Sequence, residues 1–149
     1  MSRELSANDL HEQAKRYREI ADAILDQREI LQAKIKNLKE EGASREKIQE
    51  LEKKIEFLNE QNPKLKNAAK SLDAQGVVKV MTNLENAKQR IEAITDKVLE
   101  AVKKFDGTKE ALNVLSLFIN LATAIATGGT VAAKIDSFVS ELDNLTRDL

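Results

Sequence analysis

Residues that could carry out chemistry are few in this sequence, and their spacing does not bring them together. The chain has one histidine, His11, in the segment "DLHE" between Asp9 and Glu12. A metal site needs further ligands that converge on the same point, and no second histidine follows at four-residue spacing. We therefore interpret His11 as a solvated surface residue and expect no metal site.

Other catalytic patterns are missing as well. No serine lies in a Gly-x-Ser-x-Gly turn, no glycine-rich loop of the nucleotide-binding kind occurs, and there is no cysteine. Acidic pairs such as Glu40 and Glu41 fall at expected helix ends, where no pocket would separate their pKa values. The sequence therefore predicts a protein that is not an enzyme and that binds no cofactor.

The overall charge excludes two further classes of function. Lys and Arg number 24, Asp and Glu number 25, and the two signs are interleaved along the chain. A nucleic-acid surface or a polybasic membrane anchor needs concentrated positive charge, so we expect neither. The first 20 residues lack the contiguous apolar stretch of a signal peptide, which favours a cytoplasmic location but leaves open whether the protein is released from the cell.

The pattern of apolar residues predicts helices. One proline, five glycines and 3% aromatic residues leave little material for strands and turns. Apolar residues recur at alternating steps of three and four, and Ser6, Gly42, Ser44 and Asn62 are suitable caps or stops. We expect helices over about 6–41, 44–61, 63–74, 77–105, 109–127 and 131–147, with a bend or a break near Gly76.

Helices with these bounds predict an all-α fold. The short connection around Gly42 predicts that the first two helices pack antiparallel as a coiled-coil hairpin. We expect one elongated antiparallel helical bundle over 1–149 that ends in an apolar helix–Gly-Gly–helix hairpin. No internal repeat or linker divides the chain.

The heptad stripe of the first helix is the first candidate for a functional surface. It is aliphatic except for two members, and Arg28 is the one charged residue in it. A charge in a coiled-coil seam sets register or pairing at a cost in stability, although an arginine at the end of a bundle can also extend to solvent. We expect a seam for self-association, made of Tyr17, Ile24, Arg28, Leu31 and Ile35.

A second candidate is the stretch "ALNVLSLFINLATAIATGGTVAA", residues 111–133, which has no ionisable side chain. It is nominally long enough to cross a membrane, but two consecutive glycines interrupt it, and Lys134 and Asp136 follow soon after. We therefore expect a buried hairpin and no constitutive transmembrane helix. The residues that could enter lipid conditionally are Leu112, Leu115, Phe118, Ile119, Leu121, Ile125, Gly128 and Gly129.

In layout the chain resembles the α-helical pore-forming toxins of the cytolysin A type and their multi-component relatives. The segment "LNVLSLFINLATAIATGGTVAAKI" corresponds to their apolar hairpin, and the heptad series of the long helices corresponds to their stalk. The resemblance implies a protein whose hairpin enters lipid.

Two hypotheses for function follow. The first is a helical-bundle protein that acts by protein–protein association, with a second copy of itself as the expected partner. The alternative is a membrane-active or pore-forming protein whose hairpin 111–133 enters lipid.

Overall fold

The computed structural model describes residues 4–74, 79–104, 109–127 and 132–147. Within these ranges the chain forms five helices and two short strands, and it is the all-α helical bundle that the sequence predicts. The elements in order are β1 (Glu4–Ser6), α1 (Ala7–Glu40), α2 (Arg45–Ala74), β2 (Lys79–Met81), α3 (Ala87–Lys103), α4 (Lys109–Ala126) and α5 (Ala132–Thr146).

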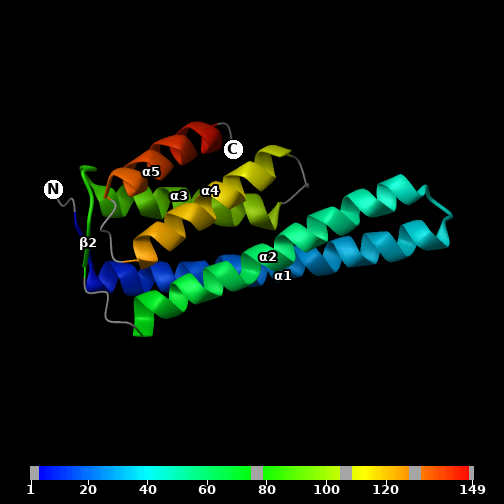
Figure 1. Cartoon of the computed structure of the whole chain (residues 1–149), viewed down its shortest axis with the longest axis horizontal. Coiled ribbons are helices and arrows are strands. Elements are labelled where there is room, and N and C mark those ends of the chain that lie inside the picture. The colour runs from blue at the N-terminus through cyan, green and yellow to red at the C-terminus, as the bar shows by residue number, and fades with distance from the viewer. Residues whose placement is uncertain (1–3, 75–78, 105–108, 128–131, 148–149) are drawn as a thin grey trace.

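The long helices α1 and α2 form an antiparallel hairpin whose ends are set by local signals (Figure 1). Ser6 caps α1 in a capping box with Asp9, as the sequence predicts. Gly42 follows α1 with a φ of 73°, a left-handed conformation that favours glycine. The Ser44 hydroxyl accepts a hydrogen bond from the Lys47 amide at 3.4 Å, so both helix ends at this turn are as expected.

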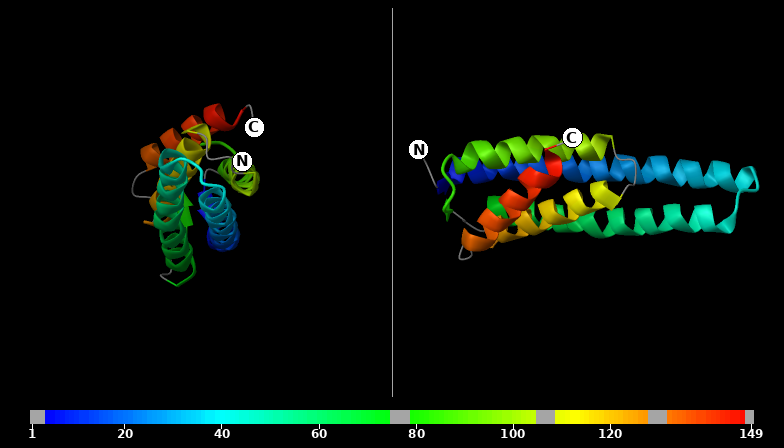
Figure 2. Two further views of the ribbon diagram at one scale, coloured as in Figure 1. Left: turned by 90° about the vertical axis from the view of Figure 1, so that its right-hand side faces the viewer. Right: turned by 90° about the horizontal axis from the view of Figure 1, so that it is seen from above.

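The remaining helices cover one half of this hairpin. Helix α3 packs mainly along α1, α4 packs along α2, and α5 packs on α4 and α3 (Figures 1 and 2). One core cluster contains buried residues from all five helices and from both strands. The other half of the α1–α2 hairpin projects beyond α3 and α4 (Figure 2).

Helix α2 runs without interruption through Pro63, which corrects the expected division into helices 44–61 and 63–74. A proline inside a helix removes one backbone hydrogen bond and disfavours a straight course. Here the apolar residues on both sides, Leu58 and Leu65, are fully buried in the same core. The Asn62 side chain, expected as a cap, instead donates to the Ala21 carbonyl at 2.8 Å and ties α2 to α1.

The predicted start of the helix over 77–105 is also wrong, because α3 begins at Ala87. Val80 lies in strand β2, which pairs antiparallel with β1 and places Val80 opposite Leu5, both of them buried. The spacing of Val80 and Leu84 imitates a heptad, but β-branched residues also favour strands. Asn86 then has a φ of 54°, which prevents a helix from continuing back through it.

The last two helices agree with the sequence. Helices α4 and α5 lie within a residue of the expected bounds 109–127 and 131–147. The expected Gly128-Gly129 turn and the question of a bend near Gly76 lie outside the described residues.

Candidate functional site

The predicted self-association seam lies largely inside the chain. Tyr17 and Ile24 are 0% exposed, Leu31 is 6% exposed and Ile35 is 9% exposed. These four side chains are covered by helices of the same chain, which corrects the expectation that they form an exposed seam. A partner surface must therefore lie elsewhere.

The fifth seam residue, Arg28, belongs to a layer of polar contacts across the bundle. Its Nη1 donates to Asn59 Oδ1 at 3.2 Å, and its buried Nε has no hydrogen-bond partner among the described residues. Next to it, Gln27 Nε2 donates at 3.0 Å to the carbonyl of Lys103, the last residue of α3. With Asn62, these residues form the polar layer, which fixes how α1 meets α2 and α3 because each contact needs one geometry.

The polar layer is also where α3 stops covering α1, and the sequence of α1 explains why. Residues of α1 on its side toward α3 recur every seven positions, namely Gln13, Ile20 and Gln27, and all three are buried. Gln13 contacts the Thr95 hydroxyl of α3 at 3.2 Å. The next residue in this series is Lys34, which is exposed, so α1 offers no further apolar surface of this kind to α3.

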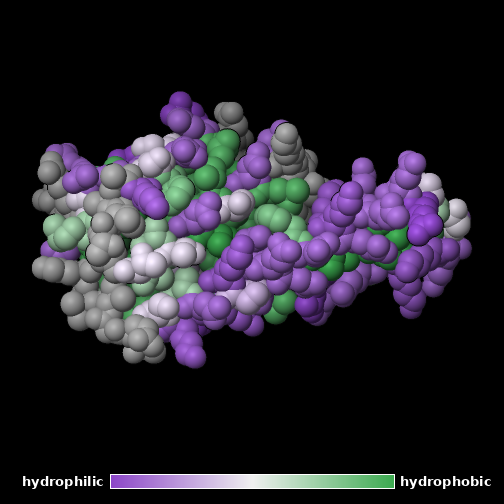
Figure 3. Space-filling model, in the orientation of Figure 1, coloured by the Kyte–Doolittle hydropathy of each residue, from purple (hydrophilic) through white to green (hydrophobic). Residues whose placement is uncertain are grey.

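Beyond the polar layer, α1 and α2 continue alone as a two-helix projection, residues 30–57, which we call the arm (Figures 1 and 2). At about 1.5 Å per residue, the 11 residues of α1 and the 13 residues of α2 within the arm give it a length of about 18 Å. Charged and polar side chains cover most of it, and apolar surface appears along the line between its helices (Figure 3).

Apolar groups remain accessible at the base of the arm. Ile30 is 47% exposed, one of the most exposed large apolar side chains in the described part of the chain. Half-buried Phe57 and Leu112 line a groove of about 610 Å³ between α2 and the start of α4, which we call the arm groove. Its other lining residues are Glu50, Lys53, Lys54, Asn113 and Ser116.

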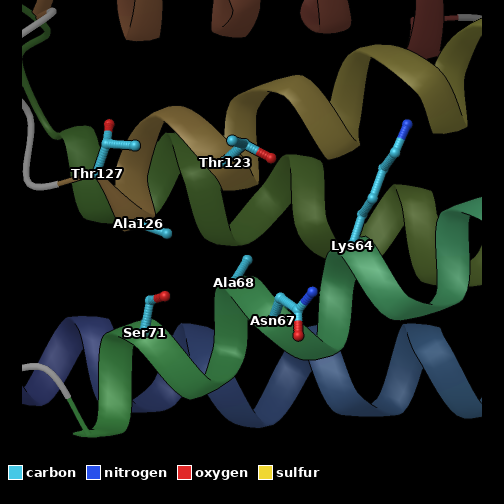
Figure 4. A pocket seen from close by; sticks show the side chains of 7 residues that line it. All are labelled: Lys64, Asn67, Ala68, Ser71, Thr123, Ala126 and Thr127. Atoms are coloured by element: carbon cyan, nitrogen blue, oxygen red, sulfur yellow. The ribbon is translucent and has the colours of Figure 1, made fainter.

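A second hollow, of about 250 Å³, lies further along between α2 and α4 (Figure 4). Its polar groups do not converge on a common point. The Thr123 and Thr127 hydroxyls donate to carbonyls of α4 itself, at 2.9 and 2.8 Å, and the Thr127 hydroxyl points away from α2 (Figure 4). Lys64 extends its amine past α4 instead of into a shared site. The lining of this hollow contains no carboxylate and no histidine that could activate one of its hydroxyls.

The predicted lipid-entering residues of α4 face the core. Leu115, Phe118, Ile119, Leu121 and Ile125 are at most 3% exposed, whereas Leu112 is half-buried at the arm groove. Gly128 and Gly129 lie outside the described residues. None of the helices in the described ranges combines the length and apolar content that crossing a membrane requires.

The inner face of α4 meets a buried tyrosine. The Phe118 ring packs edge-on against the ring of Tyr17, with centroids 5.7 Å apart and planes at 83°. The Tyr17 hydroxyl is buried and has no hydrogen-bond partner among the described residues. Burial raises the pKa of this phenol, so it stays neutral and is not poised for proton transfer.

The histidine considered for metal binding contacts a carboxylate of α2 instead. His11 Nδ1 lies 2.7 Å from Asp73 Oδ1, and Arg18 binds the other oxygen of the same carboxylate. The hydrogen bond from Arg18, and then that from His11, hold the pKa of Asp73 below its usual value against the opposing effect of burial. No group of three or more potential metal ligands occurs in the described parts of the chain.

Comparison with protein-family models finds none that matches, and comparisons with curated proteins and with solved structures likewise find no similar protein. The function must therefore be inferred from the arm, the arm groove and the α4–α5 hairpin.

Proposed function

We propose that this protein acts by protein–protein association, without catalysis, and that the arm is its contact surface, with a second copy as the partner. The observation that carries the proposal is the arm itself, in which two helices project beyond the rest of the bundle. Two packed helices bury only one stripe of each, so partly exposed apolar side chains such as Ile30 and Phe57 remain at its base.

The alternative surfaces support association less well. Met81 and Leu145 are also exposed, at 49% and 40%, but each is a single apolar side chain away from the arm. Isolated apolar residues are normal on protein surfaces. At the base of the arm, by contrast, the exposed Ile30 is accompanied by the half-buried Phe57 and Leu112 of the arm groove.

Light scattering on a sizing column, over a wide range of protein concentration, tests the proposal. We expect the mass to rise with concentration for the unaltered protein and for Leu145→Asp, and to stay at that of one chain for Ile30→Asp. Both substitutions place a carboxylate on an exposed site, so the pair separates the arm from general surface charge. Equal effects of the two substitutions would remove the arm from the proposal.

A second candidate function is membrane activity of the α4–α5 hairpin, as the resemblance to pore-forming toxins implies. The buried, unpaired Tyr17 hydroxyl supports it, because docking α4 over this group carries a desolvation cost of about 1–3 kcal/mol. Release of α4 would restore water to the hydroxyl. Flotation with neutral and anionic vesicles tests this candidate: we expect binding with loss of amide-exchange protection in α4, and no binding to either vesicle would eliminate it.

A further inference from the structure

We infer that two copies pair by stacking their arms antiparallel, so that the outer end of each arm lies on the base of the other. The contact surface is the side of the arm that continues the surface covered by α3 and α4 in the rest of the bundle (Figure 2). We call it the open face, and its residues lie within 30–41 and 46–57. This inference rests on the proposed function, since it specifies the contact by which two copies associate.

Residues of α1 reach the open face at seven-residue spacing. Gln27 contacts the end of α3, so Lys34 and Glu41, seven and fourteen residues later, lie on the same side of the arm. Ile30 follows Gln27 by three residues, and Asn37 follows Ile30 by seven. All four of these later side chains are exposed, because α3 ends before it reaches them.

Residues of α2 form the other half of the open face. Glu50, Lys53 and Lys54 are among the residues that line the arm groove beside the start of α4. Glu46 and Lys47 lie seven residues before the two lysines of the groove and therefore point to the same side. The α2 half of the open face is thus charged along most of its length.

Charge is divided unevenly along the open face. Arg28 of α1 contacts Asn59 of α2, and in antiparallel helices this contact places Lys34 level with Lys53. Together with Lys54, these two lysines give the half of the open face near the bundle three positive charges and no carboxylate. The outer half carries three carboxylates and one lysine, namely Glu41, Glu46, Glu50 and Lys47. None of these seven side chains makes an ion pair within the described residues, so their charges are available to a partner.

This distribution of charge favours a second copy as the occupant, because antiparallel stacking places each positive half on a negative half. The two-fold axis crosses the middle of the arm near Asn37 and Glu50, which the same Arg28–Asn59 contact places level with each other. Glu50 of one copy then faces Lys53 of the other, and each Glu46 lies opposite the other copy's Lys54. Such an interface is closed, so it makes a dimer instead of an open filament.

The stacked arrangement also keeps the rest of the two bundles apart. The arm of one copy occupies the layer of the other copy's α3 and α4, just beyond the ends of those helices (Figures 1 and 2). The α3–α5 layers of the two copies therefore lie at opposite ends of the pair. Each Ile30 lies over the turn of the other copy, near Ala43, so the pair covers the apolar surface that Ile30 exposes in a single copy.

The size of the open face predicts a weak dimer. An overlap about 18 Å long and two helices, or roughly 20 Å, wide buries only about 360 Å² of each copy. A stable dimer buries about 800 Å² or more on each side. Such a contact is transient, and we expect a dissociation constant in the high micromolar range or above, which rises further as salt is added.

Charge reversal tests the contact by sedimentation equilibrium. One variant carries Lys53→Glu with Lys54→Glu, and a second carries Glu46→Lys with Glu50→Lys. We expect each to associate at least tenfold more weakly than the unaltered protein, because like charges then face each other at both contacts of the pair. A variant with all four substitutions should associate as the unaltered protein does, because opposite charges face each other again.

The matched control is Lys36→Glu with Lys39→Glu, which changes the net charge by the same amount as the Lys53 and Lys54 variant. Lys36 follows Gln27 by nine residues, or two and a half turns, so it points away from the open face. We expect this control to associate as the unaltered protein does. Circular dichroism confirms that each variant is folded.

A cysteine close to the two-fold axis tests the position of the two arms relative to each other. Mild oxidation of Asn37→Cys should link two copies far faster than the same treatment of Lys36→Cys, its neighbour on the far side of α1. If the unaltered protein is monomeric at every concentration, the proposed function fails with this inference. If it associates, but the Lys53 and Lys54 variant associates equally well or the two cysteine variants link at equal rates, the inference alone is overturned and the proposed function stands.

Discussion

Replacing Tyr17 with phenylalanine should make the protein more stable, although Tyr17 lies at the centre of the core. The hydroxyl is buried without a hydrogen-bond partner among the described residues, and an unpaired buried polar group costs about 1–3 kcal/mol. Phenylalanine keeps the edge-on contact with Phe118 and leaves a gap of only one oxygen atom. We expect a net gain of about 1 kcal/mol in the free energy of unfolding, which for a domain of this size raises Tm by about 2–4 °C.

Urea unfolding followed by far-ultraviolet circular dichroism measures this gain as a higher midpoint with an unchanged slope. The matched control is Thr95→Val, which also removes a buried hydroxyl. That hydroxyl lies 2.7 Å from the Ile91 carbonyl and 3.2 Å from Gln13 Oε1, so its loss should destabilise the protein by about 1 kcal/mol. If Tyr17→Phe destabilises the protein as Thr95→Val does, the tyrosine hydroxyl has a partner in solution and the reasoning is refuted.

Three further predictions concern the turn, the polar layer and the ion pair of α2. Gly42→Ala should lower the free energy of unfolding by about 1–2 kcal/mol through backbone strain alone, because φ is 73° and nothing lies within 4 Å of the added carbon. Thermal unfolding measures this loss, and the loss should be smaller for Gly42→Asn. Asn62→Ala removes the buried hydrogen bond to α1 and should cost about 1–2 kcal/mol in urea unfolding, whereas exposed Asn67→Ala should change little. The pKa of Asp73 is lower in the folded protein than in the unfolded chain. The ionised carboxylate therefore contributes its full stabilisation at pH values above the usual aspartate pKa of about 3.9, and this stabilisation is lost as the pH falls through the lower pKa of the folded state. Asp73→Asn should therefore lower the free energy of unfolding near neutral pH by less than about 1 kcal/mol, since its ion pair with Arg18 is partly exposed. The same substitution should have no effect in strong acid. An equal loss of stability at neutral pH and in strong acid would contradict this prediction.

The sequence predicts the helix ends correctly where the contacts that determine them lie within a few residues. The ends of α1 depend on Ser6 and Gly42, whose effects operate within a few residues, and both were predicted. The two wrong predictions of helix bounds, at Pro63 and before α3, concern segments whose structure depends on contacts with distant parts of the chain. Pro63 lies within a helix because buried neighbours on both sides pack against α1, and Val80 lies in a strand because Leu5 pairs with it. Neither contact is visible in the spacing of residues.

The candidate site was only partly predictable for the same reason. The heptad stripe correctly identified apolar residues of α1, but periodicity does not show whether a stripe is covered by the same chain or by another. Ile30 lies off that stripe, so the periodicity of α1 does not indicate it. The seven-residue spacing of Gln13, Ile20 and Gln27 was a usable signal of a second covered face that ends before Lys34. The arm groove joins α2 to α4, about 60 residues apart in the chain, and no short-range pattern indicates it.

Because the chain contains no cysteine, introduced cysteines can test directly whether copies associate through the arm. One variant carries Ala33→Cys, an exposed position of α1 within the arm, and the matched control carries Ser137→Cys, an exposed position of α5. Mild oxidation of the concentrated protein should give a disulfide-linked pair far faster for Ala33→Cys than for Ser137→Cys. Equal rates for the two variants would contradict association through the arm.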